Sequence, residues 1–216
     1  MTSNKSILFK DILIIIPSKN EYLNLKILFN HLKRYKIKKL IIDDNSNDDT
    51  DKIKNEFSNL KIIKNKTSKG YDFSIKKGLL FAKLNYKYAI TLDADFEHDP
   101  KYIPKFINSL KNYEIVIGNR DRKNRIFEKI IGFIFSKKYY IKDLFCGYRA
   151  INLSLIDKKK LNSNVDVAKL IYEICKKKFP VKNINIKSKK RVDESRFGNY
   201  INGNLKIIYQ FIKIFF

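Results

Sequence analysis

Cysteine is scarce in this sequence. The 216 residues contain two cysteines, Cys146 and Cys175, which are far apart and match no spacing typical of metal ligands. Small secreted domains that depend on disulfide bonds carry many more cysteines, and such bonds persist mainly in oxidising compartments. The cysteine count therefore argues against a disulfide-stabilised fold and favours a protein of the reducing cytoplasm.

Long hydrophobic runs are also missing. No segment supplies the roughly 20 uncharged apolar residues that a membrane-spanning helix needs. The N-terminal MTSNKSILFKD has no apolar core followed by a small-residue cleavage site, so no signal peptide is expected. No repeat is visible, and no linker rich in Pro, Gly or Ser divides the chain. These absences predict a protein that is soluble or peripheral to a membrane.

Acidic residues are outnumbered. There are 22 Asp and Glu against 46 Lys and Arg, which gives a formal net charge of +24. Two interpretations of this excess stay open. It favours an anionic partner, such as nucleic acid, anionic lipid or a phosphorylated substrate. Alternatively, Lys, Ile and Asn dominate throughout, as an AT-rich genome would produce, and the charge is spread over solvated faces.

Core-forming residues, by contrast, are plentiful. The hydrophobic fraction of 44% and the aromatic fraction of 13% are too high for a disordered chain. Short β-branched runs predict buried strands, and the longer segments between them predict helices. We expect strands at 12–16, 39–43, 60–64, 88–93 and 114–118, and helices at 23–35, 50–57, 71–84 and 102–110. This alternation predicts an α/β fold with a mostly parallel sheet covered on both faces.

The second half of the chain is less regular. Residues 125–141 form an apolar, aromatic and basic segment, and DLFCGYR (143–149) has the composition of a loop. A helix is expected at 165–178 and a last strand at 181–186. In folds of this class, ligands bind beyond the carboxyl ends of the strands. The residues that follow the predicted strands are therefore the candidates for a functional site.

Carboxylates follow one of these strands at alternating positions. Asp93 and Asp95 come directly after an apolar run, and Glu97 follows at the same spacing. Side chains alternate along extended backbone, so a D-x-D places two carboxylates on one side. Such a pair suits Mg²⁺ or Mn²⁺, which complete their coordination with water and substrate phosphate. The alternative is a capped turn before a helix that starts at Asp99-Pro100.

Two other strand ends carry polar residues. IIIPSKNE (14–21) ends a strand at Pro17; its Asn20 is a candidate helix cap, and the loop is a candidate wall around a nucleobase and ribose. IIDDNSNDDT (41–50) offers Asp44 as an acceptor for ribose hydroxyls or a base N–H. Its alternative is a cap and an Asx turn.

These segments resemble a known family. The blocks P-x-x-N-E, D-D-x-S-x-D-x-T and D-A-D-x-x-x-D-P occur in this order, and together they resemble the inverting glycosyltransferase family 2, which has the GT-A fold. Within it the likeness is greatest to dolichyl-phosphate and polyprenyl-phosphate sugar transferases. Residues 65–83, 116–122 and 143–150 match further blocks of this family, so the resemblance covers roughly residues 10–200.

The resemblance implies a metal-dependent reaction. A sugar, mannose or glucose, would pass from a GDP- or UDP-sugar to a polyprenyl or dolichyl phosphate. Mg²⁺ or Mn²⁺ would be held by Asp93 and Asp95, with Glu97 as a further ligand. Catalytic roles are expected for Asp95, Arg120, Asp143 and Arg149, with Arg120 on the nucleotide phosphates and Arg149 near the acceptor phosphate. The donor is expected to contact Pro17, Lys19, Glu21, Ile42, Asp44, Asp93, Ala94, Arg120, Arg191 and Arg196.

The sequence departs from the family in several places. The family closes with R-x-x-G-x-S-K, whereas this chain has KRVDESRFG (190–198), without that Gly and one residue shorter in spacing. Arg191 and Arg196 are the expected phosphate ligands, with Lys190 as a substitute. Phe73 and Ser74 stand where small residues are usual. Many relatives also carry C-terminal transmembrane helices, so a membrane-anchoring partner subunit is a further expectation.

The acceptor decides whether a general base is needed. A lipid phosphate is already ionised near neutral pH and requires none, which fits the lack of an obvious catalytic histidine. His31 falls inside a predicted helix, and His98 has no role in the family's motifs. If the acceptor were instead a sugar hydroxyl, a carboxylate base would be required, and Asp143 or Asp166 would be the candidates.

Two aromatic and basic segments are candidates for membrane contact. Residues 125–142 and 205–216 place Phe, Ile and Tyr beside Lys and Arg, as interfacial helices do. Their alternative is a core-packing helix and a frayed tail. We therefore expect a GT-A catalytic domain at 1–199 and an amphipathic tail at 200–216, peripheral on the cytoplasmic face of a membrane. A soluble transferase that extends a surface glycan is an alternative. A basic nucleic-acid-binding protein is another, although no nucleic-acid motif is present.

Overall fold

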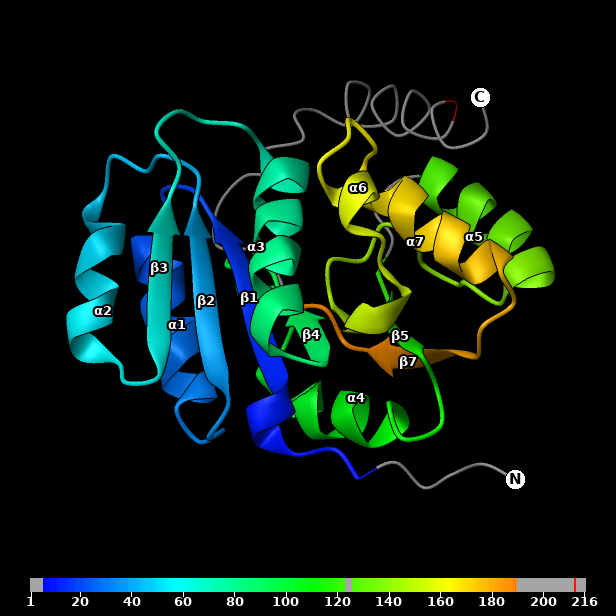
Figure 1. Cartoon of the computed structure of the whole chain (residues 1–216), viewed down its shortest axis with the longest axis horizontal. Coiled ribbons are helices and arrows are strands. Elements are labelled where there is room, and N and C mark those ends of the chain that lie inside the picture. Colours follow the sequence, from blue (N-terminus) through cyan, green and yellow to red (C-terminus); the bar gives the residue numbers. More distant parts are fainter. Residues whose placement is uncertain (1–5, 123–125, 190–211, 213–216) are drawn as a thin grey trace.

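The computed structural model describes residues 6–122, 126–189 and 212. These residues build a seven-stranded sheet of order β3-β2-β1-β4-β6-β5-β7 (Figure 1). All neighbouring strands are parallel except β6, which runs antiparallel to both β4 and β5. The predicted α/β fold with a mostly parallel sheet is confirmed. The strands are β1 Ile12–Ser18, β2 Lys38–Asp43, β3 Leu60–Lys64, β4 Tyr88–Thr91, β5 Ile115–Arg120, β6 Arg149–Asn152 and β7 Val181–Ile186.

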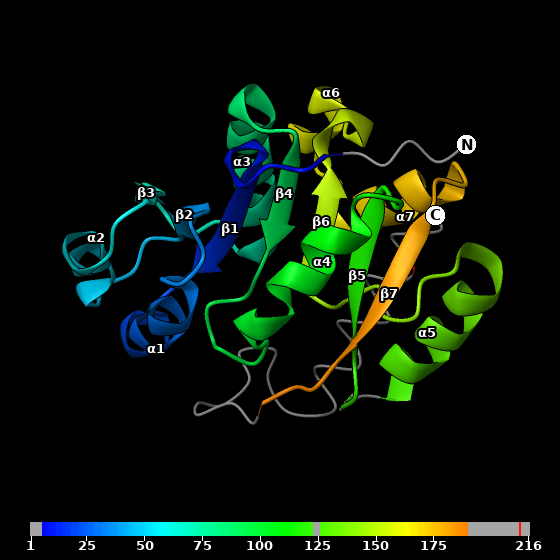
Figure 2. The ribbon, with the colours of Figure 1, turned by 90° about the horizontal axis from the view of Figure 1, so that it is seen from below.

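Helices cover both faces of the sheet. Figure 2 shows α3 and α6 on one side of the sheet and α1 and α4 on the other, while α5 lies near the β7 edge. At this edge the rings of Phe135 and Tyr139 from α5 contact Tyr172 of α7. The helices are α1 Tyr22–Leu32, α2 Ile53–Glu56, α3 Tyr71–Asn85, α4 Ile103–Ser109, α5 Ile126–Tyr139, α6 Lys158–Leu161 and α7 Val167–Lys176.

The core is built on β1, the strand at the centre of the parallel half. All seven of its residues are buried, because β2 and β4 flank it and helices cover both faces. Helix α3 lies close to this strand at Gly78. A Cβ atom added to Gly78 would lie 2.4 Å from Cγ2 of Ile15, so a larger residue would force the helix away from the sheet.

Most predicted elements are confirmed, and the differences concern short segments. The run at 88–93 ends as a strand at Thr91, so Asp93 lies in the following loop. The predicted helix at 50–57 divides into a 3-10 turn, Asp49–Lys52, and the four-residue α2. The segment predicted as a loop at 143–149 ends in strand β6, which begins at Arg149. Helix α6 was not predicted.

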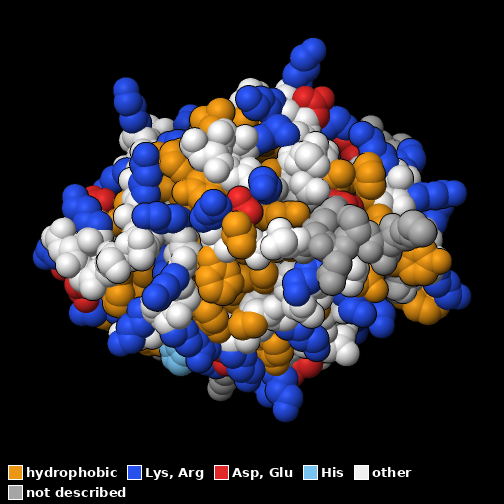
Figure 3. Space-filling view, turned by 60° about the horizontal axis from the view of Figure 1, so that its bottom comes forward, with side chains coloured by type: hydrophobic (Ala, Val, Ile, Leu, Met, Phe, Trp, Pro, Cys, Tyr) orange, Lys and Arg blue, Asp and Glu red, His pale blue; other side chains and the backbone are white. Residues whose placement is uncertain are grey.

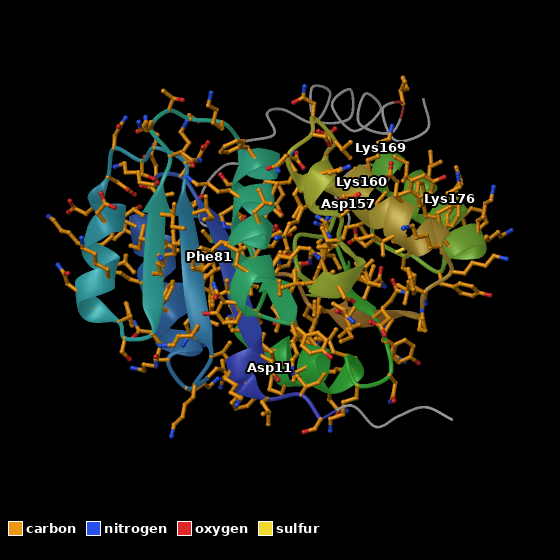
Figure 4. The ribbon with its side chains drawn as sticks, viewed as in Figure 1. Asp11, Phe81, Asp157, Lys160, Lys169 and Lys176 are labelled. Carbon is orange, nitrogen blue, oxygen red and sulfur yellow. The ribbon has the colours of Figure 1, made fainter. Side chains whose placement is uncertain are left out.

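Basic side chains are spread over the surface. On the face shown in Figure 3, Lys and Arg are scattered among hydrophobic groups and do not gather in one stripe. Lys160 of α6 forms an ion pair with Glu173 of α7, and Lys169 and Lys176 extend from α7 in the same region (Figure 4). None of the described helices has the length and apolar character that a membrane crossing requires. The predicted tail at 200–216 lies outside the described residues except for Ile212.

Candidate active site

The carboxylate of Asp93 lies directly beyond the end of β4. Thr91 is the last residue of this strand, and its hydroxyl donates to the carbonyl oxygen of Gly147 at 2.6 Å. This bond brings the loop before β6 against the start of the D-x-D segment. A Cβ atom added to Gly147 would lie 2.2–2.6 Å from the carboxylate atoms of Asp93. The φ angle of Gly147 is not in the left-handed region, so the close approach, and not the backbone conformation, requires glycine here.

His98 contacts Asp93 from the other side. Its Nδ1 is 3.4 Å from Oδ2 of Asp93, and its Nε2 is 3.8 Å from Sγ of Cys146. The ring is 1% exposed, and the backbone of His98 forms an antiparallel bridge with Ser188. Burial lowers the pKa of His98 to about 4 and raises the pKa of the Cys146 thiol to about 12. Both groups are therefore neutral near pH 7. No role was predicted for His98, and its position next to the D-x-D is the one signal in the sequence that points to it.

The D-x-D loop continues through Asp95 and Glu97. Oδ1 of Asp95 accepts a hydrogen bond from the backbone N–H of Glu97 at 3.0 Å, and Phe96 between them has a φ of 57°. All three acidic side chains of this loop are partly exposed. Among the described residues no three His, Cys, Asp or Glu side chains converge into a ready metal cage. Two half-open carboxylates nevertheless suit Mg²⁺ or Mn²⁺, whose remaining ligands come from water and phosphate.

Asp44 organises the loop that leads into α3. Its Oδ1 accepts hydrogen bonds from Nδ2 of Asn65 at 2.8 Å and from the N–H of Lys69 at 2.7 Å. Its Oδ2 accepts from the hydroxyl of Ser68 at 2.7 Å and from the N–H of Gly70 at 2.8 Å. A carboxylate has about four lone-pair sites, so a ribose hydroxyl would have to share one of them. The predicted contact between Asp44 and the donor stays a prediction.

The ionisation of Asp44 gives a prediction about stability. Burial alone would raise its pKa, but the four hydrogen bonds outweigh burial and hold the pKa below its usual value. A lowered pKa stabilises the fold above the ordinary aspartate pKa of about 3.9, and this contribution is lost as the pH falls through the lowered value. We expect Asp44→Asn to reduce the free energy of unfolding at pH 7 by about 1–3 kcal/mol.

Urea denaturation at several pH values measures this effect. The difference between wild type and Asp44→Asn should shrink below pH about 4, where the wild-type carboxylate also loses its charge. Asp51→Asn, which changes an exposed aspartate in the same way, serves as the control. A difference that stays constant from pH 7 to pH 3 would contradict the assigned hydrogen bonds.

The loops after β1 and β2 are bonded to each other. The N–H of Asn20 donates to the hydroxyl of Ser46 at 2.8 Å, and Oδ1 of Asn20 accepts from the N–H of Asn47 at 2.9 Å. The predicted cap of α1 by Asn20 is wrong. Asn20 has a φ of 50°, and the first helical N–H, that of Tyr22, donates instead to Oδ2 of Asp48 at 2.9 Å. The helix thus begins with a carboxylate from the neighbouring loop.

The other residues predicted to contact the donor lie in β1 and β2 or in the loops that follow β1 and β4. Pro17 and Ile42 are register partners in β1 and β2 and are buried, as is Ala94. Lys19 donates to the hydroxyl of Ser68 at 2.8 Å. Glu21 accepts from Nδ2 of Asn24 at 2.6 Å. Arg191 and Arg196, and their substitute Lys190, lie outside the described residues.

Arg120 and Asp143 bind each other. Nε of Arg120 is 2.8 Å from Oδ2 of Asp143, and its Nη2 is 3.0 Å from Oδ1, so the pair is bidentate. Glu128 adds a third charge, 3.7 Å from Nη2. Despite burial, the hydrogen bond and charge of Asp143 raise the pKa of Arg120 above its usual range. The guanidinium of Arg120, predicted to bind the nucleotide phosphates, is therefore paired with Asp143. The carboxylate of Asp143, predicted to take part in catalysis, is paired with Arg120.

Arg149 is buried beneath the site. Its Nη2 donates to the carbonyl oxygen of Leu144 at 2.9 Å, and only 3% of the residue is exposed. Its Nε and Nη1 have no hydrogen-bond partner within the described part of the chain. Its positive charge acts to lower the pKa of Tyr71 and of Asp72, although the net shift of both is upward. A buried guanidinium with spare donors is well suited to an anionic ligand.

Tyr71 and Asp72 belong to the site but were not predicted. Although 41% of Tyr71 is exposed, desolvation of its hydroxyl and the charge of the neighbouring Asp93 carboxylate raise its pKa. Burial also raises the pKa of Asp72, and the neighbouring charge of Asp166 raises it further. Oδ1 of Asp72 accepts from the N–H of Val167 at 2.8 Å and so caps α7. The hydrogen bond of Asp72 joins residues 95 positions apart, which local sequence patterns do not reveal.

The seven-stranded, mostly parallel sheet with helices on both faces is a GT-A-like α/β fold. A 4-diphosphocytidyl-2C-methyl-D-erythritol synthase from Anaerococcus prevotii superposes with a TM-score of 0.60 and 19% identity, covering 96% of this chain and 97% of that one. The TarS fragment from S. aureus superposes with a TM-score of 0.55 and 14% identity, covering 83% and 58%. At these identities the likeness shows the fold alone.

The chain belongs to glycosyl transferase family 2, whose model matches residues 13–152. The predicted family is thereby confirmed. An uncharacterised protein of Methanocaldococcus jannaschii is 32% identical over 179 residues, which are 73% of this chain and 78% of that protein. The dolichol-phosphate mannosyltransferase of Pyrococcus furiosus is 30% identical over 171 residues, which are 69% of this chain and 48% of that enzyme. This chain thus spans about half of that mannosyltransferase.

Proposed function

We propose that the protein transfers mannose or glucose from a GDP- or UDP-sugar to a polyprenyl or dolichyl phosphate. The observation that carries this proposal is Arg149, a buried cation with two spare donors beside the D-x-D loop. In the reaction, an oxygen of the acceptor phosphate attacks the anomeric carbon. The bond from that carbon to the diphosphate breaks, the configuration inverts, and the nucleoside diphosphate leaves.

The donor would lie along the carboxyl edge of β1, β2 and β4. The bonded loops after β1 and β2 supply walls for the nucleoside. Asp93 and Asp95 would hold Mg²⁺ or Mn²⁺, and this ion when bound would neutralise the diphosphate. These residues suit such an ion because they are two partly exposed carboxylates, which leave the remaining coordination positions to water and phosphate. A structurally similar protein of Mycobacterium tuberculosis has been crystallised with manganese.

The arrangement of the acidic groups favours an ionised acceptor. Asp143 accepts two hydrogen bonds from Arg120, which makes it a weak base. Arg149 offers a buried phosphate two N–H groups. One observation supports a hydroxyl acceptor, the alternative substrate of a glycan-extending transferase. Asp72 is a partly buried carboxylate near Asp166 with a raised pKa, which suits a general base.

Relatives support the lipid acceptor. The enzymes of Saccharomyces cerevisiae and Pyrococcus furiosus are named dolichol-phosphate mannosyltransferases. A Methanococcus voltae protein, 29% identical over 77% of this chain, is named a UDP-N-acetylglucosamine–dolichyl-phosphate N-acetylglucosaminyltransferase. These names share a lipid phosphate acceptor and differ in the sugar, so the assay must include several donors.

The first test follows sugar transfer into lipid. The protein is incubated with Mn²⁺ or Mg²⁺, a panel of GDP- and UDP-sugars, and vesicles that contain polyprenyl phosphate. Metal-dependent labelling of the lipid from one donor is expected. Donor binding without a lipid product would contradict the lipid acceptor and favour a glycan acceptor. No binding of any nucleotide sugar would overturn the proposal.

Arg149→Met tests the acceptor site directly. Methionine fills similar space without charge, and replacing a buried charge by an apolar group need not destabilise the fold. We expect transfer to polyprenyl phosphate to fall about 100-fold or more, since a preorganised phosphate ligand is lost. The Kd of the nucleotide, measured by calorimetry, should stay within a few-fold of wild type. Equal loss of donor affinity would contradict the assignment to the acceptor.

A membrane contact through α5 is part of the proposal. Ile131 and Phe135 of this helix face the core, whereas Phe133 and Ile134 on its outer side are 61% and 43% exposed. Nζ of Lys137 lies 4.6 Å from the centre of the Phe133 ring. Exposed aromatic and aliphatic groups beside lysines bind the interface of anionic bilayers. The helix thus packs on the protein with one side and offers the other to lipid, on the cytoplasmic face.

Vesicle sedimentation checks this contact. Phe133→Glu should lower the fraction of protein bound to vesicles that contain anionic lipid at least about three-fold, because a charge replaces an inserted ring. Leu84→Glu is the matched control, since Leu84 is 67% exposed at the end of α3. Equal loss in the two variants would assign the effect to net charge alone. The same assay with the wild-type protein alone tests whether a partner subunit is needed for membrane attachment. We expect the wild type to bind vesicles without a partner.

A further inference from the structure

We propose that the cavity at the amino end of β2 is an anion site, which binds a single phosphate group through Lys39. This end of β2 is the one opposite its arrowhead in Figure 1, and about 13 Å of strand separates Lys39 from Asp43 at the carboxyl edge. The site is therefore separate from the candidate active site, and it does not rest on the proposed function.

The cavity is small and basic. Its volume is about 50 Å³, and it lies between the end of α1, the start of β2 and the segment that follows α2. Lys33, Lys36 and Lys39 line it, and none of the described side chains around it is acidic. The rings of Phe29 and Phe57, whose centres are 5.3 Å apart, form an apolar wall. A space of this size suits a small anion and is far below the volume of a typical nucleotide pocket.

Lys39 is the buried cation of this cavity. Only 4% of the residue is exposed, and its Nζ donates to the carbonyl oxygen of Tyr35 at 2.8 Å. An ammonium group has three N–H donors, and within the described residues this is the one hydrogen bond that Nζ makes. Burial lowers the pKa of Lys39, as expected for an ammonium group without a carboxylate beside it.

The surroundings offer these cations no acidic partner. Residues 33–39, KRYKIKK, contain five basic residues, and the three lysines of the cavity form no ion pair within the described part of the chain. Glu56, the acidic residue of the adjoining α2, is paired with Lys26 at 3.3 Å. The bond to Tyr35 caps the end of α1, a task that one exposed lysine could perform. An anion would supply the negative charge that buried lysines normally have beside them.

A phosphate group matches this arrangement. It carries a charge of about −1.5 to −2 and strong acceptor oxygens, and lysine binds it as a point charge. One oxygen would accept from Nζ of Lys39 inside the cavity, while Lys33 and Lys36, both exposed, would face the outer oxygens. The group could belong to a soluble phosphorylated molecule or to the headgroup of a lipid, and the experiment separates these two sources.

Backbone amides next to the cavity report binding locally. The N–H of Lys39 donates to the carbonyl oxygen of Asn59 at 2.9 Å, and Asn59 lines the cavity. In ¹H–¹⁵N NMR spectra, inorganic phosphate added at pH 7 and constant ionic strength should shift the amide signals of residues 39 and 59 to saturation. Phosphate bound in the active site would act on other amides. If the signals of residues 39 and 59 do not respond, the inference is overturned.

Three variants assign the response to the cavity. Lys39→Met should raise the Kd of phosphate about tenfold or more, because the buried charged donor is lost. Lys36→Met should raise it about threefold, since this lysine is exposed. Lys54→Met is the matched control, because Lys54 is an exposed lysine of α2 that does not line the cavity. Equal Kd values for Lys39→Met and Lys54→Met would overturn the site. If thermal melting shows that Lys39→Met is unfolded, the same comparison is made with Lys36→Met.

Vesicle sedimentation identifies the source of the phosphate group. Phosphatidic acid, whose headgroup is a phosphate monoester, is compared with phosphatidylglycerol, a diester, at matched surface charge. A preference of the wild type for phosphatidic acid that Lys39→Met loses would assign the site to a lipid headgroup. Equal binding to both lipids, with the NMR response present, would assign it to a soluble phosphate. Sugar transfer by Lys39→Met should match that of the wild type, so failure of this inference leaves the proposed function unchanged.

Discussion

Asp95→Asn is expected to abolish sugar transfer and metal-dependent nucleotide binding while the fold survives. The substitution removes one negative charge from the proposed metal pair but keeps an oxygen that can accept from the N–H of Glu97. The turn of the loop is therefore retained. The side chain is partly exposed, and surface substitutions of this kind usually change the free energy of unfolding by less than about 0.5 kcal/mol. We expect the transfer rate to fall about 100-fold or more.

The measurement compares activity, Mn²⁺-dependent nucleotide binding and melting temperature in one set of proteins. Asp49→Asn provides the control, because Asp49 is an exposed aspartate that pairs with Lys52 away from this loop. It makes the same change in net charge without touching the D-x-D. If Asp95→Asn turned over substrate near the wild-type rate, Asp95 would not be a metal ligand. The proposal that the pair Asp93 and Asp95 binds a metal ion would then be contradicted.

Gly147→Ala is expected to have an effect of similar size by a steric route. The new methyl group would lie within 2.6 Å of all three carboxylate atoms of Asp93, so the carboxylate or the loop has to move. A displacement of about 1 Å in a reacting group can lower a rate about 100-fold. The strain should also reduce the free energy of unfolding by about 1–3 kcal/mol. The variant therefore loses metal affinity although both acidic residues are still present.

Gly78→Ala separates these two consequences. Its methyl group would meet Cγ2 of Ile15 at 2.4 Å, and the three atoms nearest to it all belong to this core residue, whereas those nearest to a methyl group on residue 147 all belong to Asp93. Both variants are thus expected to be less stable, as followed by urea denaturation. Only Gly147→Ala should change the Kd of Mn²⁺ in the presence of nucleotide. If the two variants keep the same metal affinity, Gly147 does not set the place of the Asp93 carboxylate.

Much of the fold could be predicted because its signals are local. Strand β1 begins with an unbroken run of Ile and Leu, β3 has a pair of Ile residues between lysines, and the order of strands and helices follows from their alternation. Strand β6 was missed because it has four residues, begins with a buried arginine and follows a Cys-Gly pair that favours a loop. Its pairing with β4 and β5, and not its own composition, makes it a strand.

The carboxylates of the candidate site could be predicted from the sequence, but the side-chain contacts between distant segments could not. The D-x-D is visible in the sequence because Asp93 and Asp95 are separated by a single residue of one loop. The bidentate pair of Arg120 and Asp143 is not, because it depends on two segments that meet only in the folded chain. The predicted cap of α1 failed for the same reason, because Asp48, which accepts from the first N–H of this helix, lies in the neighbouring loop. The local pattern pointed to Asn20, the nearer candidate.

The position of β6 has a consequence for how the chain folds during synthesis. Residues 12–91 can pair as β3-β2-β1-β4, but the outer edge of β4 gains its partner only when residues 149–152 have emerged. Until then a fully buried apolar strand presents unpaired N–H and C=O groups, which other chains can bind. A nascent chain stopped near residue 120 should therefore recruit chaperones, and a release from them should follow the emergence of β6.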